Sequence, residues 1–337
     1  ILALRAFDIG LGDEVITSSF SFFATAEAIS AVGARPVFVD INPDNFLLDV
    51  EQIENVITPN TKAIMPVHLF GNAVNMDKIT DIASKYDLKV IEDCAQATGS
   101  MWNSKKVGGI GDIGCFSFFP TKNLGAAGDG GAVTTSNESL AIKIRELAIH
   151  GSPKRYHHTR LGYNSRLDTI QAAILNVKIK WIIKWVNDRQ KISKNYINLI
   201  KKNQFLKLPI SNSESSYHSW NQFVIRIKNL SYSSEKKFSE LFETDFIKNN
   251  SFRNALKKKL LEKGINSIIY YPIPIHAQEA YKNNNYDREN LLNTELISTE
   301  VLSLPMYPEL SFEEQKYIAE NLNLILKEFV DDAQMSA

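Results

Sequence analysis

The sequence predicts an α/β protein in which a largely parallel, doubly wound sheet is followed by a smaller domain. Short apolar runs alternate with helical patterns through the first half of the chain, as in successive β-α-β units. From about Phe205 the apolar runs shorten, turns multiply, and Lys and Asn become more frequent. We therefore expect a large domain over residues 1–200 and a small C-terminal domain over residues 201–337.

Six apolar runs are the expected strands, and they cover residues 15–17, 37–39, 63–67, 89–91, 113–119 and 132–135. The helix expected between the third and fourth strands has apolar side chains at i, i+3, i+4 and i+7, namely Ile79, Ile82, Ala83 and Tyr86. Further helices are expected over residues 140–150 and from near Ser165 towards Ile200. Ligands of such sheets bind at the carboxyl ends of the strands, so the residues directly after each run are candidates for a functional site.

Composition and charge exclude several classes of partner. The 337 residues contain 38 Lys and Arg and 38 Asp and Glu, so the net charge offers no attraction for nucleic acid. The sequence has no apolar run long enough for a transmembrane helix and no signal-peptide pattern. Cys94 and Cys115 lie in apolar strand-like runs and are expected to be packed thiols of a cytoplasmic protein. The sequence opens without Met inside a helical pattern, and we expect an N-terminal segment before Ile1.

Two motifs are weak. Residues 109–114 match G-x-G-x-x-G, but a dinucleotide-binding motif needs a strand before it and a helix after it. A polar, charged segment precedes this one and a strand-like run follows it, so we expect turn glycines. His157 and His158 are adjacent and would point apart, and no carboxylate or cysteine stands at ligand spacing from them or from His150. No metal site is expected.

A stronger pattern combines a carboxylate at a strand end with a lysine on a turn. Glu-Asp-Cys-Ala-Gln follows the fourth run at residues 92–96, and Phe-Ser-Phe-Phe-Pro-Thr-Lys-Asn-Leu-Gly stands at residues 116–125. A pyridoxal-phosphate (PLP) site needs such a lysine, whose amine forms a Schiff base with the cofactor aldehyde, and a carboxylate that keeps the pyridine nitrogen protonated. A hydroxyl and backbone N–H groups bind its phosphate. The residues alone leave two alternatives open, a capping role for Asp93 and a surface position for Lys122.

These segments resemble the DegT/DnrJ/StrS family of PLP-dependent nucleotide-sugar aminotransferases, which have the type I fold of aspartate aminotransferase. The resemblance extends over nearly the whole chain, through residues 12–17, 33–40, 66–71, 92–96, 116–131, 162–168, 171–175, 270–276 and 302–305. It implies a large domain with a mostly parallel seven-stranded sheet between helices, and a smaller C-terminal α+β domain. Family members also carry a Ser-Gly-Thr-Ala-type turn that binds the cofactor phosphate, upstream of the point where this sequence starts.

The resemblance implies roles by position. Lys122 would form the Schiff base and shuttle protons, and Asp93 would pair with the pyridine nitrogen. Gln96 would contact the phenolic oxygen of the ring, and Ser117 the phosphate. Phe22 aligns with the aromatic residue that stacks on the pyridine face, with plain core packing as the alternative.

Three further residues are implied at the edge of the site. Asn164 resembles an asparagine that reaches the cofactor phosphate of the neighbouring subunit, which implies a homodimer with shared active sites. Tyr271 and His276 are expected near the sugar nucleotide. Packing at the domain junction is the alternative for both.

The implied reaction moves an amino group from an amino acid, by family habit L-glutamate, through PLP to a keto-sugar nucleotide. Such reactions make amino sugars for bacterial surface polysaccharides and related products. Residues 120–131 resemble members that act at carbon 3, and small side chains at Gly125, Ala126 and Ala127 could leave room for that pose unless the loop only supports the lysine. The expected substrate is a dTDP-3-keto-6-deoxyhexose, with a UDP-linked 3-keto-N-acetylhexuronate or a C4 substrate as alternatives.

Two alternative functions differ from an aminotransferase in their class of activity. PLP-dependent sugar dehydratases resemble this chain but carry histidine at the lysine position, so Lys122 argues against them. The other rival is a non-catalytic relative with a regulatory or structural function. Such a protein would not need the lysine, the carboxylate, the glutamine and the serine together.

Overall fold

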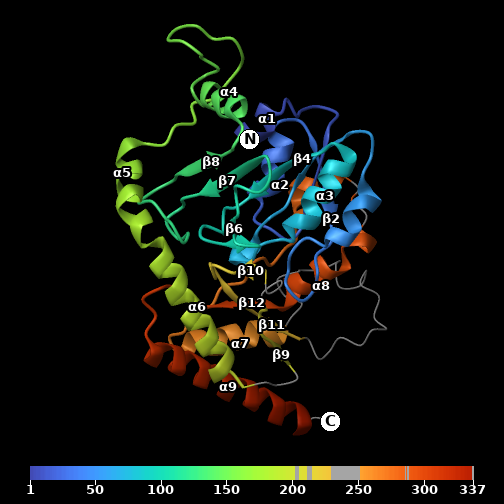
Figure 1. The fold of residues 1–337 in the computed structure, drawn as a ribbon. Coiled ribbons are helices and arrows are strands. Elements are labelled where there is room, and N and C mark those ends of the chain that lie inside the picture. Colours follow the sequence, from blue (N-terminus) through green and yellow to red (C-terminus); the bar gives the residue numbers. More distant parts are fainter. Residues whose placement is uncertain (202–204, 211–214, 229–250, 285, 287, 336–337) are drawn as a thin grey trace.

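The computed structural model describes residues 1–201, 205–210, 215–228, 251–284, 286 and 288–335. Its central feature is a sheet with the strand order β2-β1-β3-β4-β7-β8 (Figure 1). Neighbouring strands are parallel except at the β7–β8 pair, which is antiparallel. The strands are β1 (Glu14–Ser18), β2 (Arg35–Val39), β3 (Thr61–Met65), β4 (Lys89–Asp93), β7 (Ile113–Ser117) and β8 (Gly131–Thr134). The predicted mainly parallel α/β fold is confirmed.

The expected number of seven strands is wrong for the described residues, which supply six. Each of the six corresponds to one of the six apolar runs in the sequence. The number seven came from the family resemblance, and no seventh run stands in the first half of this chain. Pro36 lies in β2, at an edge of the sheet, where a residue without a backbone N–H is tolerated.

Helices cover both faces of the sheet. On one face Ile16, Ile64 and Val90 pack with the helix α3 (Met76–Tyr86). On the other face Val15 and Ile91 pack with three helices, which are α1 (Leu2–Ala6), α2 (Ala24–Ala31) and α4 (Glu138–Ala148). Successive strand residues point to opposite faces, so each strand contributes to both cores. In the described part of the chain no helix is long and apolar enough to cross a membrane.

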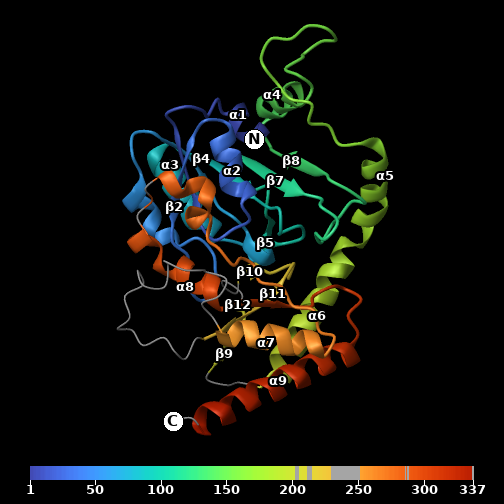
Figure 2. The same ribbon diagram turned by 180° about the vertical axis from the view of Figure 1, so that it is seen from behind.

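A second core lies at the other end of the molecule (Figure 2). Its antiparallel sheet has the order β12-β11-β9, built from β9 (Leu206–Lys207), β11 (Phe223–Ile227) and β12 (Val301–Leu304). The helices α7 (Ser251–Glu262) and α9 (Phe312–Met335) pack against it. A nearly continuous helical segment joins the two ends of the molecule, made of α5 (Thr169–Lys178), the 3₁₀ turn η3 (Ile179–Trp181) and α6 (Ile182–Leu199).

The two cores exchange segments across the boundary that we expected near residue 200. Ile192 and Tyr196 of α6 belong to the second core. In return, α8 (Leu292–Glu300) contributes Ile297 to the core of the large sheet. The short strand β10 (Ser216–Tyr217) pairs with β5 (Met101–Trp102), which in turn pairs with β6 (Lys105–Lys106). The small domain is therefore attached along several segments and not by one linker.

The glycines of the G-x-G-x-x-G segment have different surroundings. A Cβ atom at Gly114 would lie 2.4 Å from Cα of Gly108, whereas one at Gly109 would meet nothing closer than 3.6 Å. We expect Gly114→Ala to lower the free energy of unfolding by about 1–3 kcal/mol because of overpacking. Gly109→Ala should change it by less than about 0.5 kcal/mol. Urea unfolding measures both, and equal losses in the two variants would contradict the packing explanation.

Candidate active site

Three of the predicted site residues lie at or just after the carboxyl ends of β4 and β7. Asp93 is the last residue of β4 and Ser117 the last of β7. Lys122 lies in the connection from β7 to β8, where its N–H donates to the Phe119 carbonyl at 2.9 Å. The connection folds back further along, because the Ala126 N–H donates to the Phe118 carbonyl at 2.7 Å. This compact turn holds the lysine at the end of the sheet where ligands of parallel sheets bind.

The environment of Lys122 suits a nucleophilic amine. The side chain is half-buried, and burial lowers its pKa, while the charge of Asp93 partly offsets that effect. A lysine with a lowered pKa has more of its amine in the neutral form, which attacks carbonyl groups. The same electrostatic coupling places the Asp93 carboxylate within range of whatever the lysine binds.

Asp93 is held by two hydrogen bonds. Its Oδ2 accepts from the Thr25 hydroxyl at 2.8 Å, and its Oδ1 accepts from the Ala95 N–H at 3.1 Å. The Thr25 hydroxyl also contacts that of Ser21 at 2.9 Å. Thr25 was not predicted from the sequence, whereas Ser21 lies in the stretch directly after the first apolar run, where candidate residues were expected. The available signal was their four-residue spacing at the start of the helix after β1, but hydroxyls there more often cap a helix.

A group of three side chains in contact forms one wall of the candidate site, namely those of Gln96, Tyr271 and Phe22. Gln96 accepts a hydrogen bond from the Phe70 N–H and donates one to the Tyr271 hydroxyl, each 2.7 Å long. Burial raises the pKa of Tyr271, which keeps its hydroxyl protonated. The Phe22 ring lies 6.2 Å from the Tyr271 ring, and 59% of this phenylalanine is exposed. An exposed aromatic face beside a carboxylate and a lysine suits a flat heteroaromatic ring, as PLP has.

The other predicted residues lie in different settings. Asn164 is exposed and pairs with Ile149 in an antiparallel bridge next to the end of α4. His276 is buried, with Nδ1 2.6 Å from the Ser19 hydroxyl and Nε2 3.0 Å from Oε1 of Glu295. Both ring nitrogens of His276 are thus occupied, which favours packing at the junction over substrate contact. Ser117 is half-buried, and its hydroxyl accepts from the Phe119 N–H at 3.3 Å.

A cavity of about 460 Å³ opens beside the lysine. Lys122 and Asn123 form part of its wall, and the rest comes from α6 and the C-terminal unit, including Trp185, Arg189 and Tyr270. Arg189 is anchored through donation to the carbonyls of Trp220 (3.0 Å) and Met306 (2.8 Å). The volume falls in the range of small-molecule sites.

One group of possible metal ligands occurs in the described residues. Atoms of His68, Glu92 and Cys94 lie within 4.8 Å of one another. Both ring nitrogens of His68 are engaged, and the Glu92 carboxylate accepts several backbone N–H bonds. A cation would have to displace these donors. Both cysteines are free thiols, as predicted.

A mainly parallel α/β sheet with a lysine, a carboxylate and an aromatic face at its carboxyl edge defines a PLP-dependent transferase. The residues fit the cofactor, because the Asp93 carboxylate interacts with both Lys122 and Tyr271, and the Phe22 ring lies 6.2 Å from the Tyr271 ring. The chain belongs to the DegT/DnrJ/EryC1/StrS aminotransferase family, whose sequence model matches residues 1–323. It is a PLP-dependent aminotransferase.

Three relatives illustrate the family. The chain is 43% identical over 320 residues to a UDP-N-acetyl-3-dehydro-α-D-glucosamine 3-aminotransferase of Acidithiobacillus ferrooxidans, covering 95% of this chain and 79% of that one. It is 43% identical over 322 residues to the dTDP-3-amino-3,6-dideoxy-α-D-galactopyranose transaminase of Aneurinibacillus thermoaerophilus, with 96% and 81% covered. A pleiotropic regulatory protein of Geobacillus stearothermophilus is 42% identical over 330 residues, with 97% and 82% covered.

Solved structures of relatives have the same fold. DesV of S. venezuelae, in complex with a ketimine intermediate, superposes with a TM-score of 0.87 at 33% identity, covering 96% of this chain and 81% of that one. NtdA of Bacillus subtilis, with bound cofactor PMP, has a TM-score of 0.83 at 34% identity, covering 97% and 70%.

We expect borohydride reduction of the PLP-loaded protein to attach the cofactor to Lys122, whose lowered pKa increases the fraction of its amine that is neutral. Peptide mass mapping locates the attachment. Lys122→Ala should abolish it. Lys178→Ala should keep it, because Lys178 lines the same cavity but donates to the Gly125 carbonyl. Attachment to Lys178 in the wild-type protein would contradict the assignment.

Proposed function

We propose that this aminotransferase moves an amino group from L-glutamate to carbon 3 of a keto-sugar nucleotide, with a dTDP-3-keto-6-deoxyhexose as the first candidate. The observation that carries the proposal is the conjunction of the Lys122–Asp93 site with close similarity to two nucleotide-sugar aminotransferases. The donor rests on the family resemblance alone. A UDP-linked 3-keto-N-acetylhexuronate is the second candidate for the acceptor.

Each site residue has a separate task in this proposal. When bound, PLP supplies the carbonyl that accepts the amino group and the ring that takes up electrons. Lys122 Nζ removes and returns the proton at the reacting carbon, a task for which burial lowers its pKa. The Asp93 carboxylate would accept a hydrogen bond from the protonated ring nitrogen, and Gln96 Nε2 would donate to the phenolic oxygen. Ser117 would bind the phosphate.

The choice of carbon 3 is supported by the relatives and not by the loop after the lysine. In the names of the two sugar aminotransferases described above, the sugar carries its amino or keto group at carbon 3. Gly125 and Ala126 are buried, and a Cβ at Gly125 would lie 2.3 Å from the Pro120 carbonyl oxygen. Gly125 and Ala126 allow the turn to close under the lysine, whereas Ala127 is exposed. None of the three lines the cavity beside the lysine.

A homodimer with shared sites is the assembly that we propose. Several large apolar side chains are exposed along α5, η3 and α6: Ile170 (69%), Val177 (64%), Ile179 (53%), Trp181 (52%) and Ile183 (72%). Large exposed apolar side chains gathered along one helical segment favour a protein–protein contact. Asn164 lies between α4 and α5, bridged to Ile149, and in this dimer it reaches the cofactor phosphate of the second subunit.

A regulatory function is the second candidate, because one relative with 42% identity is a pleiotropic regulatory protein. The coupled Lys122 and Asp93, with the hydrogen-bonded Gln96, favour the enzyme. Measured turnover of a keto-sugar nucleotide distinguishes the enzymatic from the regulatory function.

Subunit mixing tests the shared site. Lys122→Ala and Asn164→Ala proteins should each be nearly inactive, whereas heterodimers have one site with both lesions and one with neither. Random exchange of an equal mixture should restore about one quarter of wild-type activity. Absence of rescue, with heterodimers demonstrated by differential tags, would place the whole site within one chain.

The position of amination is tested with synthetic nucleotide sugars. Supplied with L-glutamate, the enzyme should aminate 3-keto sugars at least about tenfold faster than 4-keto sugars, since a misplaced carbonyl loses the near-attack geometry. NMR of the product locates the new C–N bond. Amination of the 4-keto sugar alone would overturn the carbon 3 assignment, and no turnover with either would favour the regulatory candidate.

A further inference from the structure

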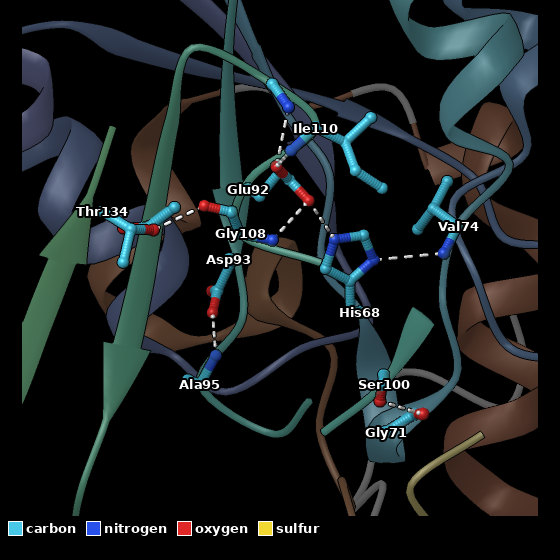
Figure 3. A network of polar contacts seen from close by, with 12 residues as sticks. His68, Gly71, Val74, Glu92, Asp93, Ala95, Ser100, Gly108, Ile110 and Thr134 are labelled. Atoms are coloured by element: carbon cyan, nitrogen blue, oxygen red, sulfur yellow. Dashed lines mark hydrogen bonds and ion pairs between the residues drawn. The ribbon is translucent and has the colours of Figure 1, made fainter. Parts of the chain in front are cut away.

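The residue before Asp93 is an unusual neighbour for a site carboxylate. Glu92 and Asp93 are consecutive in β4, so their side chains point to opposite faces of the sheet. Glu92 is fully buried. Its Oε1 accepts from the N–H groups of Ile110 (2.8 Å) and Gly111 (2.7 Å), and its Oε2 accepts from the Gly108 N–H (2.8 Å), as Figure 3 shows. The G-x-G-x-x-G segment is therefore a turn whose amides enclose a carboxylate of the same chain.

His68 completes the surroundings of Glu92. Its Nδ1 accepts from the Val74 N–H at 3.1 Å, so its Nε2 carries the proton that faces Glu92 Oε2 at 3.1 Å (Figure 3). Burial alone would raise the pKa of Glu92, but the contact with His68 and the backbone N–H bonds outweigh it, and the pKa is lowered. The glutamate is thus held as a carboxylate.

The main chain of Asp93 is bonded to the same histidine. The His68 N–H donates to the Asp93 carbonyl at 3.0 Å, and the Asp93 N–H donates to the Pro66 carbonyl at 2.9 Å. These contacts form a closed ring of hydrogen bonds and covalent chain. The ring runs from the Glu92 carboxylate to the His68 imidazole, from the His68 main chain to the Asp93 carbonyl, and back to Glu92 along β4. Such a ring fixes the direction of the Cα–Cβ bond of Asp93. Thr25 then fixes its carboxylate.

Burial of a charged carboxylate costs free energy that apolar packing would avoid. Buried polar networks that are fully satisfied instead specify one arrangement of the backbone. We propose that Glu92, through His68 and the turn of residues 108–111, is the positioning residue that aims Asp93 at the cofactor ring nitrogen. This inference rests on the role of Asp93 in the proposed function.

The chain offers a matched control in Asp40, at the end of β2. Asp40 is also buried and accepts four hydrogen bonds, from the N–H groups of Ile41, Asn293 and Thr294 and from the Thr294 hydroxyl, each 2.8 Å long. It lies at the sheet edge, separated from β4 by β1 and β3. Glu92→Gln and Asp40→Asn therefore each remove a buried negative charge and replace one accepting oxygen with an NH₂ donor, at different distances from Asp93.

The experiment compares these variants as purified PLP-loaded proteins. Both should lose thermal stability. Only Glu92→Gln should raise the dissociation constant for PLP, by about tenfold or more, and shift the pH at which the visible absorbance of the bound cofactor changes. Asp40→Asn should leave both quantities within about twofold of wild type. Glu92→Asp, which keeps the charge but shortens the side chain, should give an intermediate shift and serves if Glu92→Gln does not fold.

Asp93→Asn separates the two levels of the argument. If it leaves the absorbance transition unchanged, the role of Asp93 in the proposed function is wrong. If Asp93→Asn shifts the transition while the Glu92 variants match Asp40→Asn, Asp93 keeps its role and the positioning inference is overturned. A shift in both the Glu92 and Asp93 variants supports the inference.

Discussion

The site depends on where β4 ends between its neighbours in the sheet. β4 pairs with β3 on one side and β7 on the other, and past its last residue the Cys94 N–H donates to the Cys115 carbonyl at 2.8 Å. Parallel pairing aligns the carboxyl ends of these strands, so Asp93, Ser117 and the start of the lysine turn arrive at one edge. The residues after β1 supply Thr25 and Phe22 at the same edge. Strand register therefore fixes the spacing of groups that lie far apart in the chain.

The C-terminal unit packs against this edge of the sheet through a buried histidine. His276 lies between the Ser19 hydroxyl, just after β1, and Glu295 of α8. The Ile275 N–H also donates to the Ser19 carbonyl at 3.0 Å. These bonds tie the segment of Tyr271 to the end of β1, where its hydroxyl reaches Gln96. The histidine thus contributes to the site by holding the loop that carries the tyrosine.

Most of the architecture could be predicted from the sequence, since six apolar runs gave six strands and motif positions placed Lys122, Asp93 and Gln96. The contacts that align these groups could not be predicted. The hydrogen bond from Thr25 to Asp93 joins residues 68 positions apart. A hydroxyl at the start of a helix has the same local sequence pattern whether it caps that helix or donates to a residue of another strand. The small residues after the lysine could not be interpreted from the sequence for a related reason, because small residues are needed both where a ligand lies and where backbone segments touch, as at Gly125.

The joined helix of α5, η3 and α6 has a mechanical consequence. A 3₁₀ turn within a longer helical segment often marks a hinge, and η3 stands between an anchored end and a distant core. Lys178, just before η3, donates to the Gly125 carbonyl of the lysine turn, whereas Ile192 and Tyr196 of α6 belong to the second core. Bending at residues 179–181 is limited, because the β5–β10 pair and Ile297 of α8 also hold the C-terminal unit to the large sheet. A second subunit packed on Ile179 and Trp181 would contact the 3₁₀ turn itself, so that assembly would stiffen this connection further.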